Sequence, residues 1–192
     1  MRKTINLEFR RKILHIVIGV IIILMAIFVS QAKWILLYAV ILGIILSIAS
    51  LYIKIPVLNF FLENFERPHY RKVFPGKGLL FFVAGSLLVL KIFPPNIALA
   101  SIAILTFSDP FFSFDKRVFR GMLKIKNLRS LLLGLIAGTL AASFFISPLN
   151  ALVAAVFAAI MESIAIFLGS DQVDDNIIIP LSAGTILYLI MP

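Results

Sequence analysis

Residues 13–32 carry the sequence ILHIVIGVIIILMAIFVSQA, a run of twenty residues without a formal charge. A helix of that length rises about 30 Å, which matches the hydrocarbon thickness of a bilayer. Similar runs recur along the chain, in which 61% of the 192 residues are hydrophobic and 14% are charged. Soluble domains carry about 25% charged residues. The sequence therefore predicts an integral membrane protein built from helices.

The uncharged runs predict seven membrane-spanning helices. The run at 130–161 is too long for one span, and we place a break at Ser147-Pro148 because proline interrupts a helix. Lys91 and the two prolines after it predict a tight turn between two shorter runs. The expected fold is an all-α bundle of about seven transmembrane helices that forms a single polytopic membrane domain, residues 1–192. The spans are expected near residues 13–32, 34–53, 78–90, 92–112, 130–146, 149–168 and 176–191.

The distribution of cations predicts the orientation of the chain. With the N-terminus in the cytoplasm, 16 of the 18 lysines and arginines fall on the cytoplasmic side, and only Lys33 and Lys91 fall outside. This asymmetry follows the positive-inside rule. Seven spans then place the C-terminus outside. Because topology accounts for the net charge of +9, we expect no nucleic-acid partner.

The cysteine and histidine content excludes several kinds of site. The chain has no cysteine and two histidines. Disulfide scaffolds, cysteine-ligated zinc, iron-sulfur centres and thiol catalysis are therefore excluded, and a histidine-rich metal site is not expected.

Acidic residues toward the C-terminus have no local counter-charge. Residues 130–192 contain four acids and no lysine or arginine, whereas residues 1–129 contain all 18 cations and five acids. A carboxylate in or beside a membrane span is costly unless it is paired, hydrated or bound to metal. Asp109 and Glu162 are therefore candidate site residues, and structural salt bridges to the basic loops are the alternative.

Three of the C-terminal acids follow Gly169 closely. If the chain continues as a helix there, the i, i+3, i+4 spacing places Asp171, Asp174 and Asp175 on one helix face. Three uncompensated carboxylates are oxygen ligands of the kind that Mg2+ prefers. The spacing therefore predicts a divalent metal site.

The loop at residues 54–78 is basic and aromatic, and it has two interpretations. Phe and Tyr beside Lys and Arg suit a segment that lies on anionic lipid headgroups. Alternatively, Arg67, Lys77 and neighbouring cations converge on a triphosphate, with the backbone N–H of Gly78 available for close approach. Cations, a divalent metal and a membrane setting together predict phosphoryl transfer to a lipid.

The C-terminal acids belong to a longer pattern that resembles a known family. Glu162-Ser163, then residues 171–176 with the sequence DQVDDN, then Pro180-Leu181 are similar to the motif of the CTP-dependent polyprenol kinases. That family includes dolichol kinase, phytol kinase and CTP-type diacylglycerol kinases, and it is related to CDP-lipid cytidylyltransferases. The pattern Arg11-Lys12-x-x-His15-x-x-x-Gly19 resembles the opening motif of this family, and Glu66-Arg67-Pro68 with Lys77-Gly78 resembles its second loop.

The middle of the chain departs from the family pattern. Asp109 and Arg117 match it, but Lys116 and Arg120 stand where the family has glycines. Arg129-Ser130 stands where the family has Lys-Ser. Because glycines let the backbone approach phosphates, Lys and Arg side chains would have to meet the phosphates at the two replaced positions.

The resemblance implies a kinase that transfers the γ-phosphate of CTP to the hydroxyl of a lipid alcohol with Mg2+, on the cytoplasmic side of the membrane. The acceptor is expected to be polyprenol or dolichol, phytol-like or diacylglycerol-like. The implied metal ligands are Asp109, Asp171, Asp174 and Asp175, supported by Asn176. The implied nucleotide and phosphate ligands are Arg67, Lys77, Gly78, Arg117, Arg129 and Ser130. The residues expected to orient or deprotonate the hydroxyl are Glu66 or Glu162, with His15 as a secondary base.

Other interpretations remain open at this level. A CDP-lipid synthase would use the same metal and CTP to transfer a nucleotidyl group to phosphatidate, although the DQVDDN run favours the kinase. The replaced glycines favour a non-catalytic relative or a small transporter, and the uncompensated acids argue against both. His15 has an alternative role as a polar packing residue. Gly134 and Gly138 are a close-packing pair either within one chain or between the chains of a homodimer.

Overall fold

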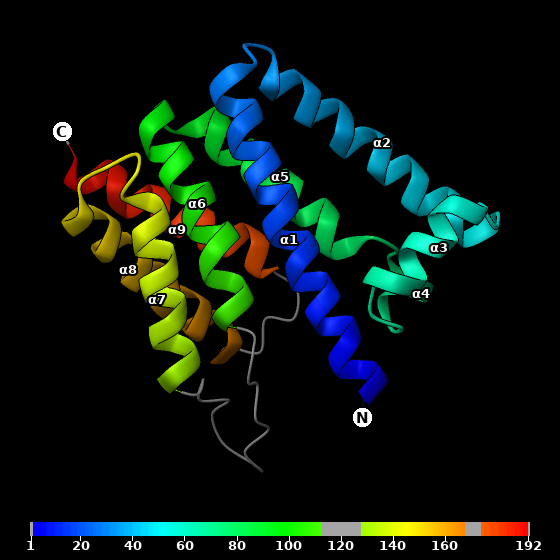
Figure 1. The fold of residues 1–192 in the computed structure, drawn as a ribbon. Helices are drawn as coiled ribbons and strands as arrows, with labels where there is room; N and C mark the ends of the chain where they lie inside the picture. The colour runs from blue at the N-terminus through cyan, green and yellow to red at the C-terminus, as the bar shows by residue number, and fades with distance from the viewer. Residues whose placement is uncertain (1, 113–127, 168–173, 192) are drawn as a thin grey trace.

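The computed structural model describes residues 2–112, 128–167 and 174–191, which form nine helices and no strands (Figure 1). The all-α prediction is therefore confirmed for the described residues. In chain order the helices are α1 (Arg2–Phe28), α2 (Ala32–Tyr52), α3 (Pro56–Phe65), α4 (Tyr70–Val73), α5 (Lys77–Ile92), α6 (Pro95–Phe112), α7 (Leu128–Ala142), α8 (Pro148–Phe167) and α9 (Asp175–Ile190).

Each of the seven predicted spans corresponds to one helix, namely α1, α2 and α5 to α9. The predicted break is present, because α7 ends at Ala142 and α8 begins at Pro148. Of the described helices, three are long and apolar enough to cross a membrane: α1 over Leu7–Phe28, α2 and α6. The described parts of α7, α8 and α9 are shorter apolar helices. The seven-span count and the orientation stay predictions.

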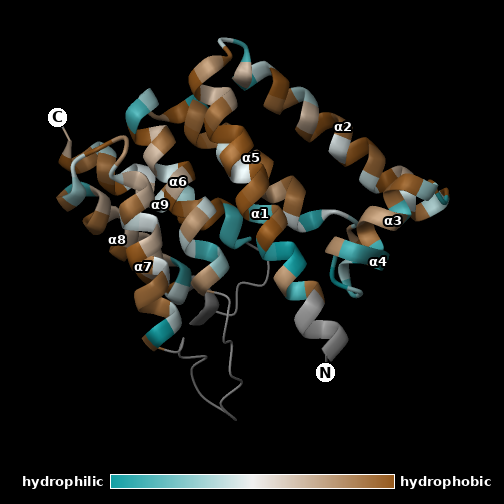
Figure 2. Ribbon diagram, in the orientation of Figure 1, coloured by the Kyte–Doolittle hydropathy of each residue, from teal (hydrophilic) through white to brown (hydrophobic). Residues whose placement is uncertain are grey.

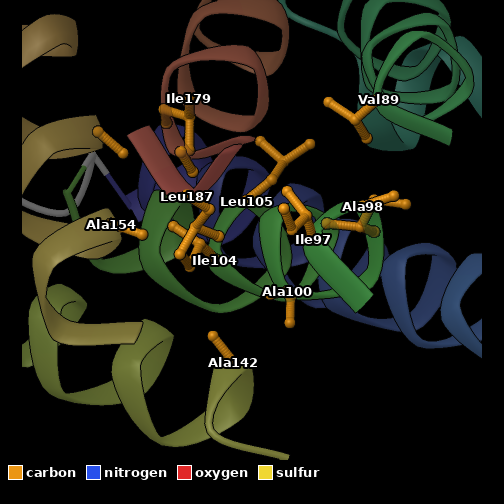
Figure 3. Packing of buried hydrophobic residues seen from close by; sticks show 14 of the residues in the cluster. Val89, Ile97, Ala98, Ala100, Ile104, Leu105, Ala142, Ala154, Ile179 and Leu187 are labelled. Carbon is orange, nitrogen blue, oxygen red and sulfur yellow. The ribbon is translucent and has the colours of Figure 1, made fainter. Parts of the chain in front are cut away.

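Helix α6 is the centre of the described bundle. It contacts α1, α5, α7, α8 and α9, and 72% of its residues are buried. Figure 3 shows Ile104 and Leu105 of α6 near Ile179 and Leu187 of α9, with Ala98 next to Ile97 on the side of Val89. Small side chains on α6 let the neighbouring backbones approach closely, while the branched side chains fill the space between them.

The Gly134 and Gly138 pair packs inside this chain. A Cβ on Gly138 would overlap the hydroxyl of Ser108, and a Cβ on Gly134 would overlap the ring of Phe112. The Ser108 hydroxyl also donates a hydrogen bond of 2.9 Å to the carbonyl of Gly134. The two glycines therefore bring α7 against α6, and the homodimer stays a prediction that this pair does not support.

Helix α2 packs much more loosely than α6. It runs away from α1 after their shared turn and lies mainly against α5 (Figure 1). Only 11% of its apolar stretch is buried. Figure 2 shows that α2 is largely hydrophobic, whereas hydrophilic residues gather on the N-terminal half of α1 and around α4. The exposed apolar surface of α2 is compatible with a helix that is surrounded by lipid.

Candidate active site

Three carboxylates meet where α6, α8 and α9 come together. Oxygens of Asp109, Glu162 and Asp175 all lie within 4.8 Å of one another, and we call these residues the acidic cluster. Glu162 is fully buried, and the other two are half-buried. Asp109 lies in the last turn of α6, where the helix dipole disfavours a negative charge. The arrangement is therefore one that a bound cation would stabilise.

The oxygens of the acidic cluster suit a divalent metal ion. Octahedral Mg2+ holds its oxygen ligands at about 2.0–2.1 Å, so ligands on opposite sides of the ion are about 4.2 Å apart. Oxygens within 4.8 Å of one another would each have to move by less than about 1 Å to reach one ion. The set consists of carboxylates, which Mg2+ prefers over nitrogen or sulfur.

A pocket of about 90 Å³ adjoins the acidic cluster and shares Asp109 with it. The pocket is formed by α1, α3, the N-terminal part of α5, α6 and the start of α9. Its polar lining combines one cation, two carboxylates, an imidazole and an amide. These side chains are Arg11, His15, Glu66, Asp109 and Asn176, and Gly76 and Gly78 also line the pocket.

His15 is fixed between α1 and α6. Its Nε2 donates a hydrogen bond of 3.1 Å to the carbonyl of Leu105, because a carbonyl oxygen only accepts. Its Nδ1 lies 3.7 Å from Oδ2 of Asp109, and its ring stands edge-on to Phe82. The nitrogen that faces the pocket carboxylate is therefore Nδ1.

Among the charged residues of the loop at residues 54–78, Glu66 is the most deeply buried. It is 4% exposed, and one carboxylate oxygen accepts a hydrogen bond of 2.9 Å from the backbone N–H of Arg67. Arg71 donates to the backbone carbonyl of Glu66. These contacts hold the turn after α3 so that the Glu66 side chain reaches the pocket.

Arg67 binds a carboxylate of this chain instead of lining the pocket. Its Nε and one terminal nitrogen donate to the two oxygens of Glu8, at 2.9 and 3.2 Å. Burial lowers the pKa of Arg67, but the hydrogen bonds and charge of Glu8 raise it more, so the pKa lies above the usual value. Glu8 also pairs with Arg11 at 3.2 Å. Arg11 and Arg67 thus share one carboxylate.

Lys77 is likewise paired within the chain. Its Nζ lies 3.7 Å from Oδ2 of Asp174 and 4.8 Å above the ring of Tyr70. Neither Arg67 nor Lys77 lines the pocket, and the phosphate clamp that they form in the sequence interpretation stays a prediction. Gly78 lines the pocket, and its carbonyl accepts from the amide of Asn176 at 3.4 Å, while its role in phosphate binding stays a prediction.

The condition for placing Asp174 and Asp175 on one helix face is not met at Asp174. Asp174 has an extended backbone, with φ −80° and ψ 140°, because α9 begins only at Asp175. Asp174 is the N-cap, and its Oδ1 accepts hydrogen bonds from the backbone and side chain of Asn176. Only Asp175 of these two acids therefore joins the acidic cluster.

The remaining predicted residues lie elsewhere. Arg129 and Ser130 are in the first turn of α7, the former exposed and the latter buried, and neither lines the pocket. Asp171 and Arg117 lie outside the described residues.

Two features of the site are not predicted from the sequence. Arg11 lines the pocket, and its position one helical turn before His15 was the available signal, since such residues share a helix face. Glu162 was predicted as a base, whereas the structure brings it to the acidic cluster. No local spacing reveals this second feature, because it depends on the packing of α8 against α6 and α9.

Comparisons with known proteins leave the family open. No protein-family model, curated protein or solved structure matches this chain.

Proposed function

We propose that this chain is a membrane lipid kinase that transfers the γ-phosphate of CTP to the hydroxyl of a lipid alcohol with Mg2+, on the cytoplasmic side of the membrane. The observation that supports this most directly is the shared position of Asp109. Asp109 belongs both to the acidic cluster and to the lining of the polar pocket. A metal-bound phosphate and an acceptor hydroxyl would therefore meet beside one carboxylate.

The acidic cluster would hold the metal ion, which on binding would neutralise charge on the transferring phosphate. Arg11 supplies the cation in the pocket lining, and a planar guanidinium suits phosphate oxygens. Its half-buried pair with Glu8 is weak enough to be exchanged for a phosphate, because pairs open to solvent contribute little.

Two groups in the pocket would accept the hydroxyl proton of the acceptor. One is Nδ1 of His15, which faces Asp109, and the other is the carboxylate of Glu66. Activity of the variants Glu66→Gln and His15→Gln across pH separates the two, because only the loss of the acting base removes the corresponding limb of the pH–rate profile.

A label-transfer assay tests the proposed function. The purified chain in lipid vesicles receives Mg2+, a panel of lipid alcohols or phosphatidate, and CTP labelled on either the α- or the γ-phosphate. We expect the γ label in a lipid alcohol. An α label in phosphatidate would instead establish a CDP-lipid synthase, which needs the same metal and nucleotide. Transfer of neither label, from CTP or from ATP, would contradict both enzyme functions.

A further inference from the structure

The pocket beside Asp109 is lined by apolar as well as polar side chains. The apolar ones are aliphatic and aromatic residues from three helices. These residues are Leu14 and Ile18 of α1, Phe61 and Phe65 of α3, and Leu79 and Phe82 of α5.

The change from polar to apolar follows the axis of α1. Arg11, His15 and Ile18 share one face of this helix, and Arg11 and Ile18 are separated by about 10 Å along the axis. All three lie in the segment Leu7–Phe28, which is long and apolar enough to cross a membrane. Ile18 therefore lies nearer the middle of that segment than Arg11. A ligand that matches this face of α1 carries a polar head near Arg11 and a hydrocarbon chain near Ile18.

The size of the pocket determines how much of such a ligand enters. A cavity of 150 Å³ holds one benzene molecule, so a pocket of about 90 Å³ holds about three or four carbon-sized groups. Only the hydroxyl and the first carbons of a lipid alcohol would enter. The rest of the chain would leave past the exposed apolar residue Phe60 of α3.

A second apolar hollow makes a less suitable hydroxyl site. It lies between α7 and α8 and has a volume of about 350 Å³. Its lining contains no ionisable side chain, and the Ser163 hydroxyl in it already donates to the carbonyl of Ala159 at 2.7 Å. A hydrocarbon chain would be accommodated there, but the hydroxyl would find no base and no cation.

We propose that four of the apolar residues form a subsite for the first carbons of the lipid acceptor, and that its chain passes between α1 and α3 into the bilayer. The identity of the ligand as a phosphate acceptor rests on the proposed function, whereas its place of binding is testable without catalysis. We call these residues the chain subsite: Leu14, Ile18, Phe61 and Phe65.

Photolabelling of the full chain in lipid nanodiscs tests this subsite. The probe is a long-chain primary alcohol with a diazirine close to the hydroxyl, and the adducts are mapped by mass spectrometry. We expect adducts concentrated on the chain subsite. Adducts concentrated in the hollow between α7 and α8, or spread evenly over exposed apolar residues, would overturn the proposal.

Two tryptophan variants provide a matched pair. Ile18→Trp fills the pocket, whereas Val17→Trp adds the same ring to the exposed neighbouring position of α1. We expect Ile18→Trp to reduce labelling of α3 by about tenfold, and Val17→Trp to leave it unchanged. Equal labelling in both variants would contradict the subsite. If Ile18→Trp does not fold, Phe61→Trp fills the pocket from the facing helix.

The two proposals fail separately. Transfer of the γ label by a chain whose adducts lie elsewhere would overturn the subsite and leave the kinase standing. Adducts on the chain subsite without transfer of either label would overturn the kinase and leave a lipid-binding pocket.

Discussion

The bundle around α6 and the N-terminal helices α1 to α4 are packed very differently. In α6, 72% of the residues are buried, against 11% in the apolar stretch of α2. The acidic cluster comes entirely from α6, α8 and α9, whereas the pocket cation Arg11 comes from α1. The tightly packed part thus supplies the acidic cluster, and the loosely packed part supplies the pocket cation together with the carboxylate of Glu66.

This division has a physical basis. Neighbouring carboxylates repel one another when they are charged, and the packing of α6, α8 and α9 against one another holds the three side chains in place. The pocket cation Arg11 is paired with Glu8, and the two side chains are 21% and 40% exposed, so Arg11 can exchange this partner at low cost. We infer that the proposed metal ligands are fixed beforehand and that Arg11 is recruited as a phosphate ligand when the nucleotide binds.

We expect the largest effect from substitutions in the acidic cluster. Asp109→Asn and Asp175→Asn should each lower the rate of γ-phosphate transfer by about 100-fold or more, because each removes a charged group from the proposed metal site. Initial rates over a range of Mg2+ concentrations measure this. Glu63→Gln, which alters an exposed acid of α3, is the matched control and should keep its activity. Unchanged rates in both aspartate variants would contradict the proposed role.

The next effect tests the contact between α5 and α9. A Cβ on Gly85 would overlap the backbone carbonyl of Asn176, and a backbone group has little freedom to move away. Gly85→Ala should therefore lower the free energy of unfolding by about 3 kcal/mol, despite the better helix propensity of alanine. Thermal unfolding in detergent measures this. Stability equal to that of the unaltered chain would show that the two helices are not in tight contact.

A pair of glycine substitutions compares the two parts of the molecule directly. A Cβ on Gly134 would overlap the fully buried ring of Phe112, whereas a Cβ on Gly43 of α2 meets only the tip of the flexible Leu80 side chain. Gly134→Ala should cost about 1–2 kcal/mol, and Gly43→Ala should be neutral or slightly stabilising. Unfolding midpoints of the two variants under the same conditions provide the comparison. Equal losses of stability in the two variants would show that α2 and α7 are packed equally tightly against their neighbours.

We expect the smallest effect from a substitution of Arg67, which pairs with Glu8. Arg67→Ala removes the pair with Glu8, in which both side chains are 40% exposed, and should destabilise the fold by less than about 1 kcal/mol. The effect should weaken further at high salt. Unfolding at low and high ionic strength measures this. A large loss of CTP affinity with unchanged stability would instead restore Arg67 to the phosphate-binding role that the sequence predicts.

The sequence predicts the long helices well because uncharged runs and prolines determine where they begin and end. It does not reveal α3 and α4, which lie in a charged loop and are too short to form such runs. Asp109 is found because a carboxylate next to a membrane span is costly. The spacing of Asp174 and Asp175 does not show that the two residues have different roles, because those roles depend on the residue at which α9 begins. The ion-pair partner of Arg67 depends on the approach of α1, which no local pattern encodes.

The hydrogen bond from His15 to Leu105 restricts what the imidazole can do with a proton. A histidine acts as a relay when it takes up a proton on one ring nitrogen and releases another from the opposite nitrogen. Here Nε2 is engaged by a carbonyl inside the helix bundle, so only Nδ1 is available for exchange. A proton that arrives at Nδ1 must therefore leave from the same atom. His15 can store and return a proton, but it cannot conduct one from the pocket into the interior of the bundle.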